Sequence, residues 1–117
     1  EELRDDMPSG CAEGAADAVE AARTAVLLAP EEPLAHEYLG WGLYLSGELA
    51  AAEEALERAI ALDSASARAH FRLGIIRIAM GNSEEARQDF ARAVDLDPEG
   101  TYRQRAELAL GGLDGSR

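Results

Sequence analysis

The chain has 117 residues, and its 23 acidic and 11 basic side chains give a formal net charge of −12. An acidic field of this strength argues against nonspecific binding to nucleic acid or to anionic membranes. The length suits one domain, and a 47% share of hydrophobic residues is enough to bury a modest core and argues against wholesale disorder.

The N-terminal residues 1–11 are predicted to form a tail. They open with Glu1 and Glu2 instead of a basic stretch followed by an apolar one, so they do not resemble a signal peptide. No run of 18 apolar residues occurs in the chain, and a membrane span is therefore not expected. The missing initiator Met is compatible with a removed leader, although the cytoplasm is the favoured compartment. Cys11 has no partner for an intramolecular disulfide, because it is the single cysteine of the chain.

Hydrophobic periodicity, interrupted by glycine and proline, predicts six amphipathic helices, at 12–29, 33–46, 48–62, 67–80, 83–96 and 100–110. Gly47 and Gly81 interrupt the pattern between neighbouring helices, because glycine adopts at little cost the left-handed conformation that ends a helix. Ser83 precedes two glutamates and is predicted to cap the helix at 83–96.

The sequence repeats itself with a fixed period of 34 residues. Shifting the chain along itself until His36 meets His70 superimposes further identical residue types, namely Leu39/Leu73, Gly40/Gly74, Gly47/Gly81, Ala52/Ala86, Arg58/Arg92, Ala59/Ala93, Leu62/Leu96 and Asp63/Asp97. A period of this size is typical of solenoids in which each unit is one helical hairpin.

Residues 33–98 resemble two tetratricopeptide repeats, a family of helical hairpins of about 34 residues each. The second unit matches better, with His70-x-x-Leu73-Gly74, Gly81, Ala86-x-x-x-Phe90-x-x-Ala93 and Pro98. The first unit ends in Ser64 where the family usually has proline, and a histidine replaces the usual large aromatic residue in both. Residues 12–30 match only the second helix of a repeat, and 101–110 resemble the cap helix that ends such arrays.

The resemblance implies an all-α fold, a right-handed α-α superhelix (a solenoid) of about six antiparallel helices in one domain. Its parts would be an N-terminal tail (1–11), a half repeat (12–32), two repeats (33–66 and 67–100), a cap helix (101–111) and a C-terminal tail (112–117). A single hairpin cannot bury its apolar face, so the units stack and curve, which creates a concave and a convex surface.

In this family the first helix of each repeat lines the concave face, where most members hold a partner segment. Carried over to this chain, the residues that would line the face are Leu34, Glu37, Tyr38, Trp41, Tyr44, Arg68, Phe71, Arg72, Ile75, Tyr102 and Arg105, and helical spacing places those of each helix on one stripe. Aromatic rings beside arginines suit an acidic segment or a C-terminal carboxylate, because a guanidinium can bind a carboxylate through two parallel hydrogen bonds. The alternative is that the aromatic residues pack between helices and the arginines form a solvated face.

The charge is unevenly distributed along the chain. Residues 1–66 hold 15 carboxylates and 3 arginines, whereas residues 67–117 hold 8 of each. The helix at 67–80 has Arg68, Arg72, Arg77 and no acid, so this groove helix has a local charge of +3 and the groove is predicted to be locally basic. Arg68 and Arg72 also match the last pair of the carboxylate clamp of chaperone adaptors, but Tyr38 stands where that clamp has asparagine, and its other members are absent.

The chain shows no motif for catalysis, nucleotide binding or metal binding. No CxxC, HExxH or glycine-rich phosphate loop occurs. His36 and His70 are expected about 10 Å apart on neighbouring helices, too far to share one zinc ion, and are assigned a structural role between helices. Acid pairs such as Glu53-Glu54 are expected in the first turns of outer helices, where they favour the helix dipole. We therefore predict that the protein is not an enzyme and uses no cofactor or metal.

The sequence thus predicts a non-catalytic protein-protein interaction module that binds a peptide or helical segment of a partner in the concave groove, without nucleic-acid binding or membrane insertion. Two alternatives stay open. The Ala-rich helix at 12–29 lacks its repeat partner, so its uncovered face could form a homodimer, unless residues 1–10 fold back over it. The chain could also be a regulatory segment that positions the catalytic domain of a larger enzyme.

Overall fold

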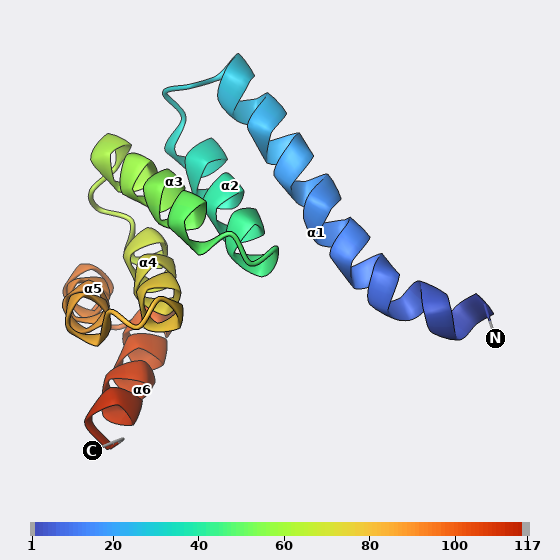
Figure 1. Ribbon diagram of the computed structural model, residues 1–117. Coiled ribbons are helices and arrows are strands. Elements are labelled where there is room, and N and C mark those ends of the chain that lie inside the picture. Colours follow the sequence, from blue (N-terminus) through green and yellow to red (C-terminus); the bar gives the residue numbers. More distant parts are fainter. Residues whose placement is uncertain (1, 116–117) are drawn as a thin grey trace.

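The computed structural model describes the backbone of residues 2–115 and the side chains of residues 16–113. Within the described residues it has no strand and six helices: α1 (Glu2–Leu28), α2 (Pro33–Leu45), α3 (Leu49–Leu62), α4 (Ala67–Ala79), α5 (Ser83–Leu96) and α6 (Thr101–Gly115) (Figure 1). The predicted all-α fold is confirmed. The internal helix ends agree with the prediction to within one residue.

Two predictions about the ends of the chain are wrong. α1 begins at Glu2, so residues 2–11 are helical instead of a tail, and their backbone continues α1 instead of folding back over it. The sequence opens with acidic residue types, which favour the start of a helix because they complement its dipole. α6 continues to Gly115, past the predicted end at 110, because Leu113 packs against the core and outweighs the low helix propensity of the neighbouring glycines.

The turns inside the two repeats follow the same local rule. Gly47 and Gly81, each just past the end of a helix, have φ angles of +87° and +86°, the left-handed conformation that glycine adopts readily. Ser66 caps α4 as an acceptor for the backbone N–H of Ala69 at 3.1 Å. Ser83, however, is not a cap. The chain returns to helix directly after Asn82, so Asn82 is the N-cap and Ser83 is the first helical residue.

The helices pack as antiparallel hairpins, α2 with α3 and α4 with α5, while α1 packs on α2 and α6 on α5. Glycine allows a close crossing within each hairpin. A Cβ atom on Gly40 would lie 2.9 Å from Leu56 Cγ, and one on Gly74 would lie 2.7 Å from Phe90 Cε1. The core consists of the residues that meet at these crossings and between the repeats, among them Leu43, Leu56, Leu73, Ile76, Phe90 and Ala106.

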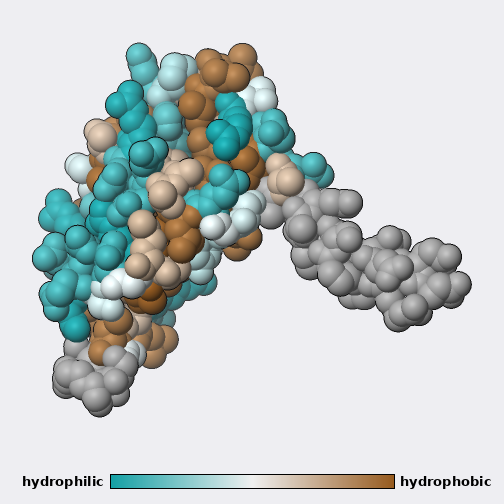
Figure 2. All heavy atoms as spheres, in the orientation of Figure 1, coloured by the Kyte–Doolittle hydropathy of each residue, from teal (hydrophilic) through white to brown (hydrophobic). Residues whose placement is uncertain are grey.

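The hairpins arrange the helices in two layers. α4 contacts both α2 and α6, so these three form one layer, and α3 and α5 lie behind them. The chain also places α1 in the position of a second repeat helix, and the N-terminal half of α1 extends away from the other helices (Figure 1). Figure 2 shows a broken band of hydrophobic surface from the α1–α2 end of the molecule down to α6, with hydrophilic residues over α3 and α5. No described helix is long and apolar enough to cross a membrane.

Candidate functional site

The surface shared by α2, α4 and α6, here called the inner face, is organised around the carboxylate of Glu37. This side chain is only 3% exposed. Arg68 Nε donates a hydrogen bond to Glu37 Oε2 at 2.5 Å, and Arg72 Nη1 lies 3.5 Å from the same oxygen. The prediction had placed Glu37 among the lining residues, but it lies beneath the two arginines and holds them in place.

Each of these arginines also lies over an aromatic ring of α2. The guanidinium of Arg68 is 5.6 Å from the ring centre of Tyr38, and that of Arg72 is 4.7 Å from the ring centre of Trp41. Trp41 in turn stacks on Tyr44 at 4.8 Å. Contacts of a cation with an aromatic face stabilise both groups by about 0.5–1 kcal/mol at exposed sites. The arginines therefore have defined positions, with side chains that are 30% and 21% exposed.

The predicted face continues onto α6 through aromatic contacts. Phe71 lies 5.7 Å from the ring of Tyr102, whose other neighbour is the Arg105 guanidinium at 5.5 Å. Phe71 also packs 5.6 Å from the buried ring of Phe90, and Ile75 packs against the same cluster. Phe71 and Ile75 thus belong partly to the core, whereas Tyr38, at 51% exposed, and Arg105 are open to solvent.

The electrostatics of the inner face follow from one carboxylate shared by two cations. The hydrogen bond to Glu37 raises the pKa of Arg68, while burial lowers the pKa of Arg72 and the charge of Glu37 only partly opposes this. Both guanidinium groups stay charged at neutral pH. The three side chains together carry a charge of +1, and each guanidinium retains N–H donors that Glu37 does not use.

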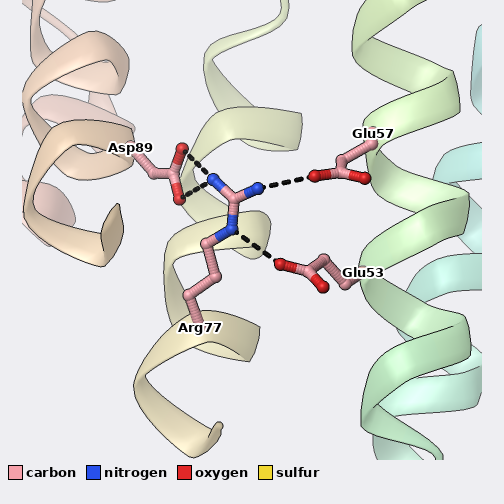
Figure 3. A network of polar contacts seen from close by, with 4 residues as sticks. All are labelled: Glu53, Glu57, Arg77 and Asp89. Atoms are coloured by element: carbon pink, nitrogen blue, oxygen red, sulfur yellow. Dashed lines mark hydrogen bonds and ion pairs between the residues drawn. The ribbon is translucent and has the colours of Figure 1, made fainter. Parts of the chain in front are cut away.

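Arg77 does not belong to this face. It extends between α3 and α5, where its guanidinium contacts Glu53 Oε2 at 3.1 Å, Glu57 Oε2 at 2.7 Å and Asp89 Oδ2 at 3.0 Å (Figure 3). The charge of +3 on α4 is therefore divided between two sides of the helix. Helical spacing contains the signal for this division, because the step from Arg72 to Arg77 corresponds to a rotation of about 140° around the helix.

The cluster around Arg77 holds three carboxylates against one cation. Burial raises the pKa of Asp89 to about 6, and the charge and hydrogen bonds of Arg77 are not enough to reverse this effect. For Arg77, burial lowers the pKa, but the hydrogen bond to Glu53 and the charge of Asp89 outweigh it, so its pKa is raised overall. Glu53 thus binds an arginine of the next repeat. The expected acidic first turn of α3 is not found, because this turn contains no acidic residue.

The two histidines have matching contacts with the loops that connect helices. His36 Nε2 lies 2.8 Å from the carbonyl oxygen of Pro30, and His70 Nε2 lies 3.1 Å from that of Ser64. Each histidine therefore ties the start of its helix to the loop that precedes it. Burial lowers the pKa of His70, which favours the neutral ring. Within the part of the chain that the structure describes, no three His, Cys, Asp or Glu residues are grouped to hold a metal ion.

Two of the surface hollows that adjoin α1 differ in their relation to the inner face. One, of about 290 Å³, is lined by alanines of α1 and by Ala35 and Tyr38, so it continues the inner face. A larger one, of about 450 Å³, lies between α1 and the end of α2, and its lining includes Glu20, Arg23 and Glu48. The larger hollow contains none of the predicted site residues.

The repeated hairpins and their glycine crossings agree with a comparison against protein families. A tetratricopeptide repeat model matches two overlapping segments, residues 12–67 and 43–101. The chain belongs to the tetratricopeptide repeat family. The family resemblance and the superhelical fold predicted from the sequence are thereby confirmed.

Solved structures with the same fold include MamA and two proteins that were solved with a segment of another protein bound. MamA aligns with a TM-score of 0.80 at 28% identity over 87% of this chain. The first repeat domain of Spaghetti (RPAP3), bound to the HSP90 peptide SRMEEVD, aligns with a TM-score of 0.81 at 21% identity. The alignment covers 97% of this chain and 85% of that domain. PcrH, in complex with the chaperone-binding region of PopD, aligns with a TM-score of 0.82 at 16% identity. The alignment covers 96% of this chain and 85% of PcrH. This chain spans 58% of the length of MamA. No match was found among curated proteins.

Proposed function

We propose that this domain is a non-catalytic interaction module that binds an acidic segment of a partner protein, or its C-terminal carboxylate, on the inner face. The observation that carries the proposal is the arrangement of Arg68 and Arg72, which are fixed between Glu37 and the rings of Tyr38 and Trp41. A guanidinium held in position loses little conformational entropy when it binds a carboxylate, so its N–H groups are suited to this ligand.

The neighbouring residues favour an extended ligand. From Tyr38 through Phe71 to Tyr102, aromatic side chains alternate with arginines across α2, α4 and α6. Aromatic residues and arginine are enriched at the centres of protein interfaces, where they supply most of the binding energy. A peptide that crosses the three helices would place apolar side chains on the rings and its negative charges beside the guanidinium groups.

Two structural relatives support a peptide as the ligand. Spaghetti and PcrH were both solved with a segment of another protein bound, and the Spaghetti peptide, SRMEEVD, has two glutamates and a terminal aspartate. At 21% and 16% identity these relatives share the fold with this chain, so its own partner has to be found by experiment.

A peptide titration tests the proposal. The probe is the peptide SRMEEVD with a free carboxyl terminus, followed through the fluorescence of Trp41, the single tryptophan of the chain. We expect binding that is weaker for the amidated peptide and at least about tenfold weaker for the double variant Arg68→Ala/Arg72→Ala.

The matched control removes the same charge elsewhere. The double variant Arg58→Ala/Arg92→Ala loses two exposed arginines of the outer helices α3 and α5 and should bind the peptide as the wild type does. If both double variants lose affinity equally, the effect is one of net charge alone and the inner-face site is wrong. Unchanged affinity in the Arg68→Ala/Arg72→Ala variant contradicts the proposal directly.

A further inference from the structure

The helix α1 has a face that its counterparts in the repeats keep covered. The face is lined by Ala18, Ala21, Ala22 and Ala25. One repeat later, these positions correspond to 52, 55, 56 and 59 of α3. Two repeats later, they correspond to 86, 89, 90 and 93 of α5. All eight of those counterparts are at most 8% exposed, because α2 covers α3 and α4 covers α5. In α1, by contrast, Ala18 and Ala21 are exposed and Ala25 is only partly buried, while Ala22 between them is 8% exposed.

The uncovered face is shaped to receive a helix. Together with Ala35 and Tyr38 of α2, the four alanines line the hollow of about 290 Å³. A Cβ atom on Gly14, one turn before Ala18, would meet no other atom within 4 Å. The face from Gly14 to Ala25 therefore spans about three helical turns, close to the 13 residues of α2 and of α4.

The packing in the two complete hairpins indicates which side chain the missing helix should have. Leu56 and Phe90 fill the crossings where α2 and α4 have Gly40 and Gly74. The equivalent residue of α1 is Ala22, which is buried but has a smaller side chain than leucine or phenylalanine and lines the hollow. A helix docked on α1 can therefore have a large apolar residue where α2 and α4 have glycine.

The course of α1 argues that this helix comes from another chain. In α3 and α5 the helix starts directly after a turn at Gly47 or Gly81, and the equivalent position in α1 is Glu13. α1 continues as a helix through Glu13 to Glu2, so the turn that would connect it to its own first helix is missing.

The charges around the face select the kind of partner. Asp17, Glu31 and Glu32 are exposed on α1 and on the loop after it, and no ion pair joins them to another residue in the described part of the chain, whereas Glu20 lies on the side of α1 that lines the larger hollow. The one basic residue from Gly14 to Pro33 is Arg23. A second copy of this chain would bring its own net charge of −12 to the contact, whereas a basic helix would complement it.

We propose that the exposed face of α1, with Ala35 and Tyr38, docks an amphipathic helix of a partner protein that has basic flanks and a large apolar residue opposite Ala22. The site is separate from the arginine pair of the inner face, so it does not depend on the proposed function. Both sites adjoin Tyr38.

The test uses a basic helix of the same repeat type as a probe. A labelled peptide with the sequence of residues 66–80 and the substitution Gly74→Leu carries three arginines and the large apolar residue. Its binding to the full chain is followed by fluorescence anisotropy. We expect saturable binding, a gain of helical circular dichroism on binding, and weaker binding when glycine is kept at position 74 or when the three arginines are replaced by glutamate.

Matched substitutions on α1 locate the binding. Ala21→Arg places a charge in the proposed contact and should weaken binding by about tenfold or more, whereas Ala16→Arg, also at an exposed alanine of α1 but beside the larger hollow, should have no effect. Arg68→Ala/Arg72→Ala should leave helix binding unchanged, and Ala21→Arg should leave binding of SRMEEVD unchanged.

Three outcomes overturn the proposal. The first is equal binding to the Ala21→Arg and Ala16→Arg variants, which would place the helix elsewhere. The second is preferential binding of the glutamate-substituted peptide. The third is a dimer of the chain alone in sedimentation velocity that Ala21→Arg dissociates, because a second copy would then be the occupant of this face.

Discussion

The two sides of α4 contain arginines in contrasting surroundings. On the inner face, Arg68 and Arg72 share one carboxylate and lie over aromatic rings, which leaves a charge of +1 and donors open to solvent. On the outer side, Arg77 meets three carboxylates from α3 and α5, which gives the cluster a charge of −2. A single helix therefore presents a site for an anion on one side and joins two repeats on the other.

The difference shows what decides the role of an arginine in this fold. Arg77 has as many partners as its guanidinium can readily bind, and it links the hairpin α2–α3 to the hairpin α4–α5 (Figure 3). The ion-pair and ring partners of Arg68 and Arg72 within the described residues lie on α2, and each guanidinium keeps N–H groups for a ligand. The number of carboxylates on neighbouring helices, not the residue type, separates the structural arginine from the candidate binding pair.

The largest effect is expected on the structural side. Arg77→Ala leaves Glu53, Glu57 and Asp89 close together without a cation, so the free energy of unfolding should fall by about 3 kcal/mol. Urea denaturation followed by circular dichroism measures this. Arg92→Ala, at an exposed position of α5, is the control and should change the value by less than about 0.5 kcal/mol. An equal loss in both variants would contradict the assigned role of Arg77.

A pH effect is expected from Asp89. Its pKa is about 6 in the folded state against an ordinary value of 3.8, so the folded state binds this proton more tightly than the unfolded state. The stabilisation from the proton is complete below pH 3.8 and is lost as the pH rises through 6. Unfolding should thus require about 1–2 kcal/mol more at pH 4.5 than at pH 7 from this group. Asp89→Asn should remove that difference, and Asp95→Asn, at an exposed residue of α5, should keep it.

On the inner face, one substitution should lower the stability slightly and strengthen peptide binding. Glu37→Gln removes the shared negative charge, so the free energy of unfolding should fall by about 1 kcal/mol. The charge of the inner face becomes +2, and binding of SRMEEVD should strengthen by about 0.6 kcal/mol, or threefold, with a steeper salt dependence. Anisotropy titrations at two salt concentrations measure this. Weaker binding with an unchanged salt dependence would show that the rigid position of the arginines matters more than their charge.

The smallest effect on stability is expected from an exposed ion pair of α6, which serves as a reference for the clusters around Glu37 and Arg77. Arg103 and Glu107 of α6 form an (i, i+4) ion pair at 3.0 Å in which both side chains are about half exposed. Glu107→Gln should lower the free energy of unfolding by only about 0.3 kcal/mol, because solvent screens the pair. Thermal unfolding in low salt is the measurement. A loss as large as that of Arg77→Ala would mean that exposure does not separate the two kinds of ion pair.

Local features were predictable because they depend on nearest neighbours in the sequence. Gly47 and Gly81 marked the turns correctly, and the repeat period indicated the hairpins and the cap helix. Ser83 was assigned as a cap although Asn82 precedes the helix, since the residue type of a cap is less specific than the spacing of the turn. The helix at residues 2–11 was missed because Pro8 and Gly10 within it suggest a break.

The candidate site was predictable only in part. The residues of the inner face were carried over from the family resemblance, with helical spacing grouping those of each helix, and the structure brings Tyr38, Trp41, Arg68 and Arg72 together. The burial of Glu37 and its contact with both arginines depend on how α4 crosses α2, which no spacing within one helix contains. The partners of Arg77 lie 24, 20 and 12 residues away along the chain and come from two different helices.

The sequence by itself determined the helices, their turns and the repeat, because helix periodicity, glycine conformations and the spacing of matching residues can all be read along the chain. It also determined which side chains share one stripe of a helix. Only the tertiary structure decided which charges neutralise each other and which faces stay open. Those depend on the crossing of helices from different repeats, where Glu37 and Asp89 become buried beside arginines while Ala18 and Ala21 of α1 stay exposed.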